Sequence, residues 1–222
     1  MMTTFAHYIL LADLFRYPDG AFPERVAKAQ AFLDGHCPEA APELAPFTAF
    51  VADASPITLE ECYTRSFDVQ AATTLDLGYV LFGDDYKRGA VLVNLNREHR
   101  EAGNPCYSEL ADHLPNVLCL LPKMTDTELR SELVEKIILP ALRKIIGDFE
   151  PAKMEGKKKV YLKHHKTWID QSANFGTIYQ WPLRALYTVM QADFSVTDQE
   201  ARHRPTTDFL KNIGTEITLE AE

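Results

Sequence analysis

Two neighbouring residues in this sequence have the types that charge pairing or proton transfer would need. Asp112 and His113 stand together shortly before Pro115. A carboxylate can orient an imidazole, but residues adjacent in a helix do not face each other. We therefore expect Asp112 to cap a helix that begins near Pro115, where losing the cap would cost about 0.5–2 kcal/mol of stability. A role for the pair in binding a partner is the alternative.

The other residues with catalytic potential have spacings that fit no familiar site. Four cysteines occur, at Cys37, Cys62, Cys106 and Cys119. They form no CxxC pair and no zinc or iron–sulfur pattern, so we expect free thiols in a reducing compartment. Ser66, Ser108 and Ser172 lie outside any GxSxG sequence. The one ExxH sequence, Glu200 to His203, has no second ligand nearby. We predict no enzyme activity and no stable metal; a metal-dependent hydrolase is the less favoured alternative.

Composition and charge disfavour two classes of binding partner, nucleic acids and anionic membranes. The chain has 222 residues, is 46% hydrophobic and carries a formal net charge of −9. A general nucleic-acid or anionic-membrane binder needs a basic surface, so both classes are disfavoured. No apolar run approaches the ~18 residues that span a bilayer. The N-terminal stretch lacks the basic region and cleavage site of a signal peptide. We expect a soluble, cytoplasmic protein.

Hydrophobic spacing predicts an all-α fold. Apolar residues recur at helical intervals throughout, which favours a single domain of about eight to ten helices over residues 1–194. We expect residues 75–82 and 129–146 to be among the most buried, because the first is apolar on nearly every side and the second has a clean apolar stripe. Residues 150–159 are predicted to form a basic loop. Residues 195–222 are predicted to form a polar, flexible tail.

Three segments together resemble a known family. They read Tyr63-x-x-x-Phe67-Asp68, then Arg88-Gly89 after an apolar helix, then Glu109-Leu110-x-Asp112-His113-Leu114-Pro115. This pattern resembles the nitrate reductase delta subunit family, the NarJ-type chaperones, within the TorD/DmsD-like redox-enzyme maturation proteins. The resemblance covers roughly residues 5–124 and fades beyond them.

The resemblance implies a TorD-like helical fold and a chaperone function in the cytoplasm. Such proteins bind the catalytic subunit of a molybdopterin oxidoreductase, often at its N-terminal segment, and hold it for molybdenum cofactor insertion before export or membrane docking. The chaperone binds no cofactor stably itself; the molybdopterin belongs to the client. Clients of related proteins act on nitrate, chlorate, perchlorate, selenate, dimethyl sulfide or ethylbenzene. A monomer and a domain-swapped dimer are both open, and a permanent structural subunit of a reductase is the alternative function.

A client surface for such a chaperone needs apolar anchors with a polar rim. We predict that acidic side chains steer a basic client segment and that neighbouring large apolar side chains hold it. The residues predicted to bind the client are Asp68, Phe82, Asp84, Asp85, Tyr86, Glu109, Asp112, His113, Leu114 and Leu118.

Overall fold

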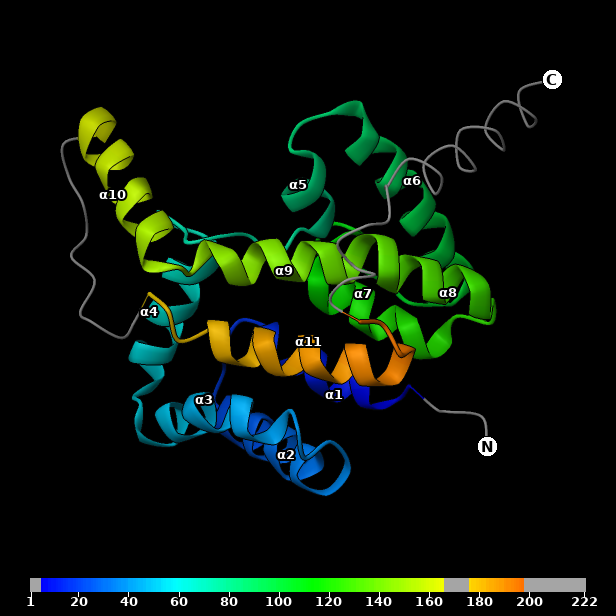
Figure 1. The fold of residues 1–222 in the computed structure, drawn as a ribbon, viewed down its shortest axis with the longest axis horizontal. Helices are drawn as coiled ribbons and strands as arrows, with labels where there is room; N and C mark the ends of the chain where they lie inside the picture. The colour runs from blue at the N-terminus through cyan, green and yellow to red at the C-terminus, as the bar shows by residue number, and fades with distance from the viewer. Residues whose placement is uncertain (1–4, 166–175, 198–222) are drawn as a thin grey trace. The chain divides into compact units, whose positions relative to one another are not determined.

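The fold is helical throughout the residues that the structure describes. The computed structural model describes residues 5–165 and 176–197 (Figure 1). Within these residues there are ten α-helices, if the continuous run from 127 to 148 counts as one, and no strand. An isolated antiparallel bridge joins Asp76 to His113. The prediction of an all-α fold is confirmed.

The chain divides into two compact units. Of the described residues, unit 1 comprises 5–12, 76–142 and 190–197, and unit 2 comprises 13–75, 143–165 and 176–189. Two of the four boundaries between the units fall inside helices, in α9 (Leu139–Asp148) and in α11 (Gln180–Phe194). The predicted tail at 195–222 lies outside the described residues from 198 onward, so its character stays a prediction.

Unit 1 contains the segments that carry the family resemblance from Arg88 onward. Its elements are α1 (His7–Ala12), α5 (Leu77–Phe82), α6 (Tyr86–Glu101), α7 (Leu114–Leu120), the 3-10 helix η2 (Leu121–Lys123), α8 (Thr127–Leu133), the π-helical segment η3 (Val134–Ile138), the first part of α9 (Leu139–Asp148) and the end of α11 (Gln180–Phe194). Helix α1 packs on α7, and α5 contacts α6 and η3. The last turn of α11 holds α1, because Asp193 Oδ2 lies 2.7 Å from His7 Nε2 and accepts a 2.8 Å hydrogen bond from the Tyr8 hydroxyl.

The run from α8 to α9 is buried as predicted. Asp126 caps α8 by accepting hydrogen bonds from the backbone N–H groups of Glu128 and Leu129. The predicted apolar stripe of 129–146 is mostly buried. Pro140 lacks the N–H that a regular helix needs, and the π-helical segment ends at Ile138, two residues before it. A π-helical turn shifts the hydrogen-bond ladder, so the helix continues through the proline.

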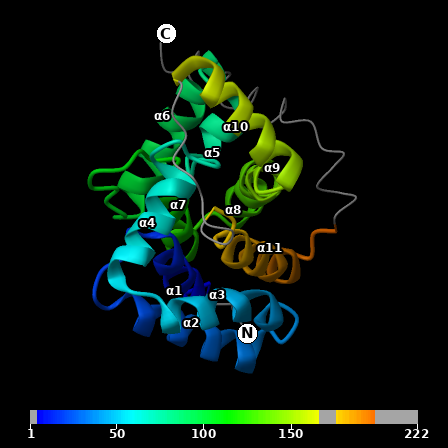
Figure 2. The same ribbon diagram turned by 90° about the vertical axis from the view of Figure 1, so that its left-hand side faces the viewer.

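Unit 2 is built around buried aromatic rings. Its elements are the 3-10 helix η1 (Asp13–Phe15), α2 (Phe22–His36), α3 (Ala41–Asp53), α4 (Pro56–Phe67), α10 (Pro151–His165) and most of α9 and α11. Helices α2 and α3 lie side by side in both ribbon views (Figure 2). The ring of Tyr179 lies 5.1 Å from that of Phe47 and 4.9 Å from that of Phe67, between centroids. Burial raises the pKa of Tyr179 well above its ordinary value, so this phenol stays neutral.

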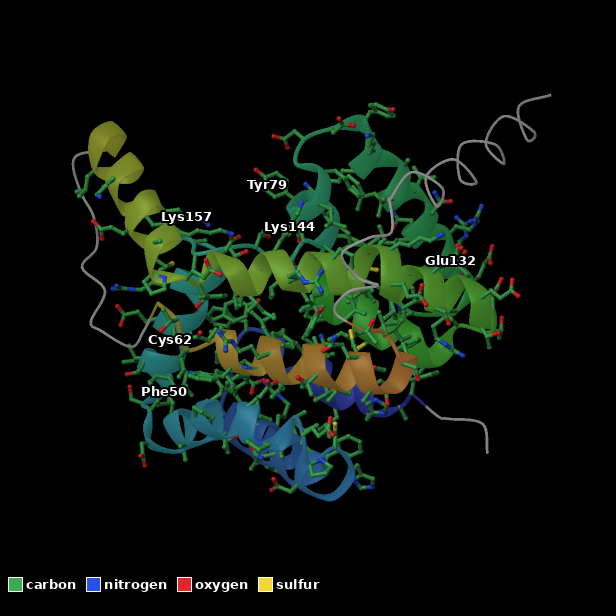
Figure 3. All side chains as sticks on the ribbon, in the orientation of Figure 1. Phe50, Cys62, Tyr79, Glu132, Lys144 and Lys157 are labelled. Atoms are coloured by element: carbon green, nitrogen blue, oxygen red, sulfur yellow. The ribbon has the colours of Figure 1, made fainter. Side chains whose placement is uncertain are left out.

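The predicted loop at 150–159 is a helix instead. Helix α10 begins at Pro151, which fits a first helical position because its missing N–H has no partner there anyway. The segment is rich in lysine with some alanine, methionine and glutamate, all good helix formers. Lys157 of α10, labelled in Figure 3, donates a hydrogen bond to the backbone carbonyl of Ala72.

Residues 75–82 are less buried than predicted. Leu75, Leu77 and Gly78 are buried, but Tyr79 is exposed and residues 80–82 are partly exposed. Tyr79, labelled on α5 in Figure 3, lies with its ring 5.2 Å from the guanidinium carbon of Arg88. An apolar helix of six residues is therefore covered on one side only, because α6 and η3 are its main neighbours.

Candidate functional site

Asp112 binds the start of α5 rather than capping α7. Its side chain is fully buried, and its Oδ2 accepts hydrogen bonds from the backbone N–H of Gly78 and from Nε of Arg88, both at 3.2 Å. The residue at the cap position of α7 is His113, whose side chain makes no capping hydrogen bond. The predicted cap near Pro115 is therefore wrong. Asp112 caps α5 from a distant part of the chain.

Three further side chains complete this arrangement. Asp76 Oδ2 accepts a 3.1 Å hydrogen bond from a terminal nitrogen of Arg88, and Asp76 Oδ1 lies 3.1 Å from Nδ1 of His113. The backbone N–H of Leu77 donates to the carbonyl of Asp112 at 3.0 Å. We call Asp76, Arg88, Asp112 and His113 the ionic cluster. It joins the first turns of α5, α6 and α7.

Charge balance holds the ionic cluster together. The hydrogen bond from His113 lowers the pKa of Asp76; burial opposes this shift, and the charges of His113 and Arg88 reinforce it. Asp112 Oδ1 is buried and has no hydrogen-bond partner among the described residues. A buried carboxylate with incomplete hydrogen bonding depends strongly on its cation. Arg88, the cation that pairs with Asp112, is therefore the residue that the cluster needs most for its stability.

Gly78 is required by the closeness of this contact. A Cβ atom at this position would lie 2.7 Å from Asp112 Oδ2 and 3.3 Å from Cγ of Arg88. The first distance is shorter than any ordinary contact of a Cβ atom. The absence of a side chain at Gly78 is what lets the buried carboxylate reach the helix N-terminus.

A second buried network fixes the chain that leads to Asp112. Nε2 of His99 lies 3.0 Å from the carbonyl oxygen of Ala111, and Nδ1 lies 2.9 Å from the amide nitrogen of Asn104. The Asn104 amide can only donate, so Nδ1 accepts and Nε2 carries the proton. Lys123 donates to Asn104 Oδ1 at 2.7 Å. His99 is thus held as a neutral imidazole.

Asn116 closes the loop between α6 and α7. Its amide nitrogen donates to the carbonyls of Cys106 and Leu110 at 3.3 and 3.0 Å. Between these anchors Tyr107 has a φ of 52°, in the left-handed region that disfavours residues with a side chain. The loop is therefore held in a defined conformation by a buried amide.

Acid should lower the stability of the fold because of His99. Burial lowers the pKa of His99 below its ordinary value of 6.5. Below about pH 6.5 the unfolded chain takes up a proton on this residue that the folded chain does not, so acid favours unfolding. Above that pH His99 is neutral in both the folded and the unfolded chain, so it adds no pH dependence to the free energy of unfolding.

The test of this expectation is urea denaturation at a series of pH values. The wild-type free energy of unfolding should fall between pH 6.5 and 5, with up to about 1.4 kcal/mol per pH unit coming from this one proton. His99→Gln should be less stable at neutral pH and should show a smaller slope. An identical slope in the two proteins would contradict the expectation.

The structure separates the predicted client-binding residues into exposed and buried ones. The exposed ones are Asp68, Asp84, Asp85, Tyr86 and Glu109. Phe82 and His113 are partly exposed. Asp112, Leu114 and Leu118 are fully buried, so in this structure they are core residues and not anchors that a partner could reach. Asp68 lies in unit 2, whereas all the others lie in unit 1.

The turn between α5 and α6 carries three of the five exposed residues of this set. Asp84, Asp85 and Tyr86 follow one another along it, and Tyr86 is 81% exposed. Asp85 also caps α6 by accepting a 2.9 Å hydrogen bond from the backbone N–H of Lys87. The ionic cluster fixes the first turn of α6, which follows this turn directly. We call residues 82–86 the acidic turn.

Sequence reasoning missed Asp76, Arg88, Asn104 and Asn116 as site residues. Arg88 stood in the family pattern, but nothing in the sequence said which carboxylates it would meet. Two signals were available. An aspartate directly before an apolar run is typical of a helix start, and an isolated glycine inside such a run, here Gly78, often has a packing reason.

Within the described residues no three His, Cys, Asp or Glu side chains gather as a metal site would require. In the same part of the chain, no helix combines the length and the apolar character needed to cross a membrane. The arrangement as a whole positions helix ends and displays an acidic, aromatic turn, which suits binding.

No family model matches this chain, and no curated protein matches it significantly.

Proposed function

We propose that this protein is a cytoplasmic, system-specific chaperone for the catalytic subunit of a molybdopterin oxidoreductase. The family resemblance supports this function, and so does the all-α fold that it implies. The observation that carries the proposal furthest is the ionic cluster. Two of the segments that carry the resemblance, around Arg88 and around Asp112, lie far apart in the sequence and meet there.

The client segment would dock on the acidic turn. Tyr86, and Phe82 where it is exposed, offer apolar contact area, and aromatic anchors supply much of the affinity at most interfaces. Asp84 and Asp85 would attract a basic N-terminal segment and set its register. The ionic cluster would act indirectly, by fixing the helices on either side.

Client identity can be tested by affinity purification from the native host grown under respiratory conditions. The expected result is capture of a large molybdopterin subunit that has not yet received its cofactor. The chaperone should be absent from the mature enzyme. Its presence there in fixed stoichiometry would indicate a structural subunit instead.

Replacing Tyr86 should weaken client binding without unfolding the protein. Tyr86→Ala removes the most exposed aromatic side chain of the acidic turn, and we expect the dissociation constant for the client's N-terminal peptide to rise about tenfold or more. Titration calorimetry measures this value. The melting temperature should stay close to that of the wild type, because an exposed side chain contributes little to folding.

Tyr17→Ala is the matched control. Tyr17 is another exposed tyrosine, with 52% of its surface exposed, but it lies in unit 2. Its replacement should leave the peptide affinity unchanged. Equal effects of the two substitutions, or no effect of Tyr86→Ala in a folded protein, would place the client surface elsewhere.

A further inference from the structure

The acidic turn has a defined backbone, with Asp84 at its tip. The backbone N–H of Asp85 donates a 3.3 Å hydrogen bond to the carbonyl of Phe82, which closes a β-turn over residues 82–85. Gly83 has φ 61° and ψ −137°, close to the values of the first central position in a type II′ turn, where glycine is preferred. Asp84 takes the second central position. The turn therefore holds Asp84 in place in the absence of a partner.

Asp85 uses both its side chain and its backbone to begin α6. Its Oδ1 accepts a 2.9 Å hydrogen bond from the backbone N–H of Lys87, and its carbonyl accepts another, also 2.9 Å long, from the N–H of Arg88. The unpaired N–H groups at a helix N-terminus stabilise a carboxylate there and offset part of its negative charge. The carboxylate of Asp85 is thus already engaged within the protein.

Asp84 keeps its carboxylate available to a partner. The residue is exposed, and in the part of the chain that the structure describes its side chain has neither a hydrogen bond nor an ion pair. Such a carboxylate can accept charge-assisted hydrogen bonds from an ammonium or a guanidinium group. Tyr86, two positions further on, is 81% exposed and adds an aromatic ring to the same short segment. The two neighbouring acids of the turn therefore differ in what they can offer to a partner.

We propose that Asp84 is the specificity-determining acid of the acidic turn, which contacts a cation of the client, and that Asp85 is a positioning residue. The proposal rests on the proposed function, in which the client docks on this turn. Both charges attract a basic segment from a distance. Only Asp84 has both carboxylate oxygens unused within the described residues. The client segment therefore presents a lysine or arginine side chain to Asp84 and an apolar side chain to Tyr86.

Binding of a synthetic peptide separates the two roles. The probe is a short fluorescent peptide of alternating lysine and leucine, titrated with the full-length protein at low and at high salt and followed by anisotropy. The same peptide with glutamate in place of lysine is the control for adsorption through leucine alone. The wild type should prefer the lysine peptide, and high salt should reduce this preference because it screens exposed charges.

Substitutions of Asp84 should change affinity but not stability. Asp84→Asn removes the charge and keeps the shape of the side chain, so the dissociation constant for the lysine peptide should rise about fivefold at low salt and change little at high salt. Asp84→Ala should have the same effect, because this side chain makes no contact that maintains the turn among the described residues. Both variants should melt close to the wild-type temperature.

The two substitutions of Asp85 should differ from each other. Asparagine caps a helix about as well as aspartate, so Asp85→Asn should keep the melting temperature and raise the dissociation constant by no more than about twofold. Asp85→Ala removes the acceptor for the N–H of Lys87 and should lower the melting temperature by about 2–4 °C. Its binding should weaken at low and at high salt alike, because the form of the turn is lost and not only a charge.

Equal losses of affinity in Asp84→Asn and Asp85→Asn would overturn this division of roles. A wild-type protein without preference for the lysine peptide would overturn it as well. Neither result would count against the chaperone function, which the capture of a molybdopterin subunit decides. If no such subunit is captured while the four variants behave as expected, the proposed function fails and the contact of Asp84 with a cation stands.

Discussion

Gly78→Ala should lower the free energy of unfolding by about 2–4 kcal/mol, more than a glycine-to-alanine change in a helix usually does. Alanine is ordinarily the better helix former, so the change in α5 would otherwise be favourable. Here the added Cβ would lie 2.7 Å from Asp112 Oδ2. Either the carboxylate leaves the helix N-terminus or α5 shifts, and both break the hydrogen bond from the Gly78 N–H to the buried carboxylate of Asp112.

Gly89→Ala is the matched control, in the helix that follows. Apart from its chain neighbours and the backbone of its own helix, no atom of the described residues lies within 4 Å of a Cβ built at Gly89. This substitution should therefore stabilise the protein by up to about 1 kcal/mol. Urea denaturation of both variants gives the comparison. If Gly78→Ala were as stable as Gly89→Ala, the close approach of Asp112 to α5 would be incorrect.

Arg88→Met should be the other severe substitution, with a loss of about 3–5 kcal/mol. It leaves Asp112, fully buried, without its cation and leaves Asp76 with His113 alone. Methionine preserves most of the length and apolar volume of the arginine stem, so the loss reports mainly on charge. Urea denaturation at neutral pH measures it.

A second substitution tests whether this loss arises from the ion pair between Arg88 and Asp112. Asp112→Asn removes the buried charge while keeping a side-chain oxygen for the N–H of Gly78. Arg88→Met combined with Asp112→Asn should therefore be more stable than Arg88→Met alone. Simple additivity of the two costs would show that the two side chains are not coupled.

The sequence predicted those parts of the fold in which local pattern decides the outcome. The stripe at 129–146 has unbroken helical spacing, and its burial followed. Helix α10 was missed because it has no apolar face; its lysine-rich sequence favours a helix through propensity alone, which hydrophobic spacing does not detect. Among the residues predicted to bind the client, Asp84, Asp85 and Tyr86 are exposed in the turn between α5 and α6.

The candidate site was harder because its contacts are long-range. Asp112 binds Gly78, 34 positions away, and nothing local to either residue indicates the other. Because these long-range contacts cannot be read from the sequence around each residue, Asp112 was predicted to be a local helix cap. For the same reason Leu114 and Leu118 were predicted to be accessible anchors. Both leucines lie on a helix with nearly every side covered, which depends on neighbours from other parts of the chain.

The three-segment construction of unit 1 has a consequence for synthesis on the ribosome. His7 and Tyr8 contact Asp193, which is made 186 and 185 residues after them. The start of α5 likewise waits for Asp112 before its first N–H groups are bonded. Residues 13–75 are made between these events and form a large part of unit 2. During translation the nascent chain therefore carries an apolar α1 without its final partners. A protein proposed to shield a segment of another chain must first keep its own α1 in a foldable state.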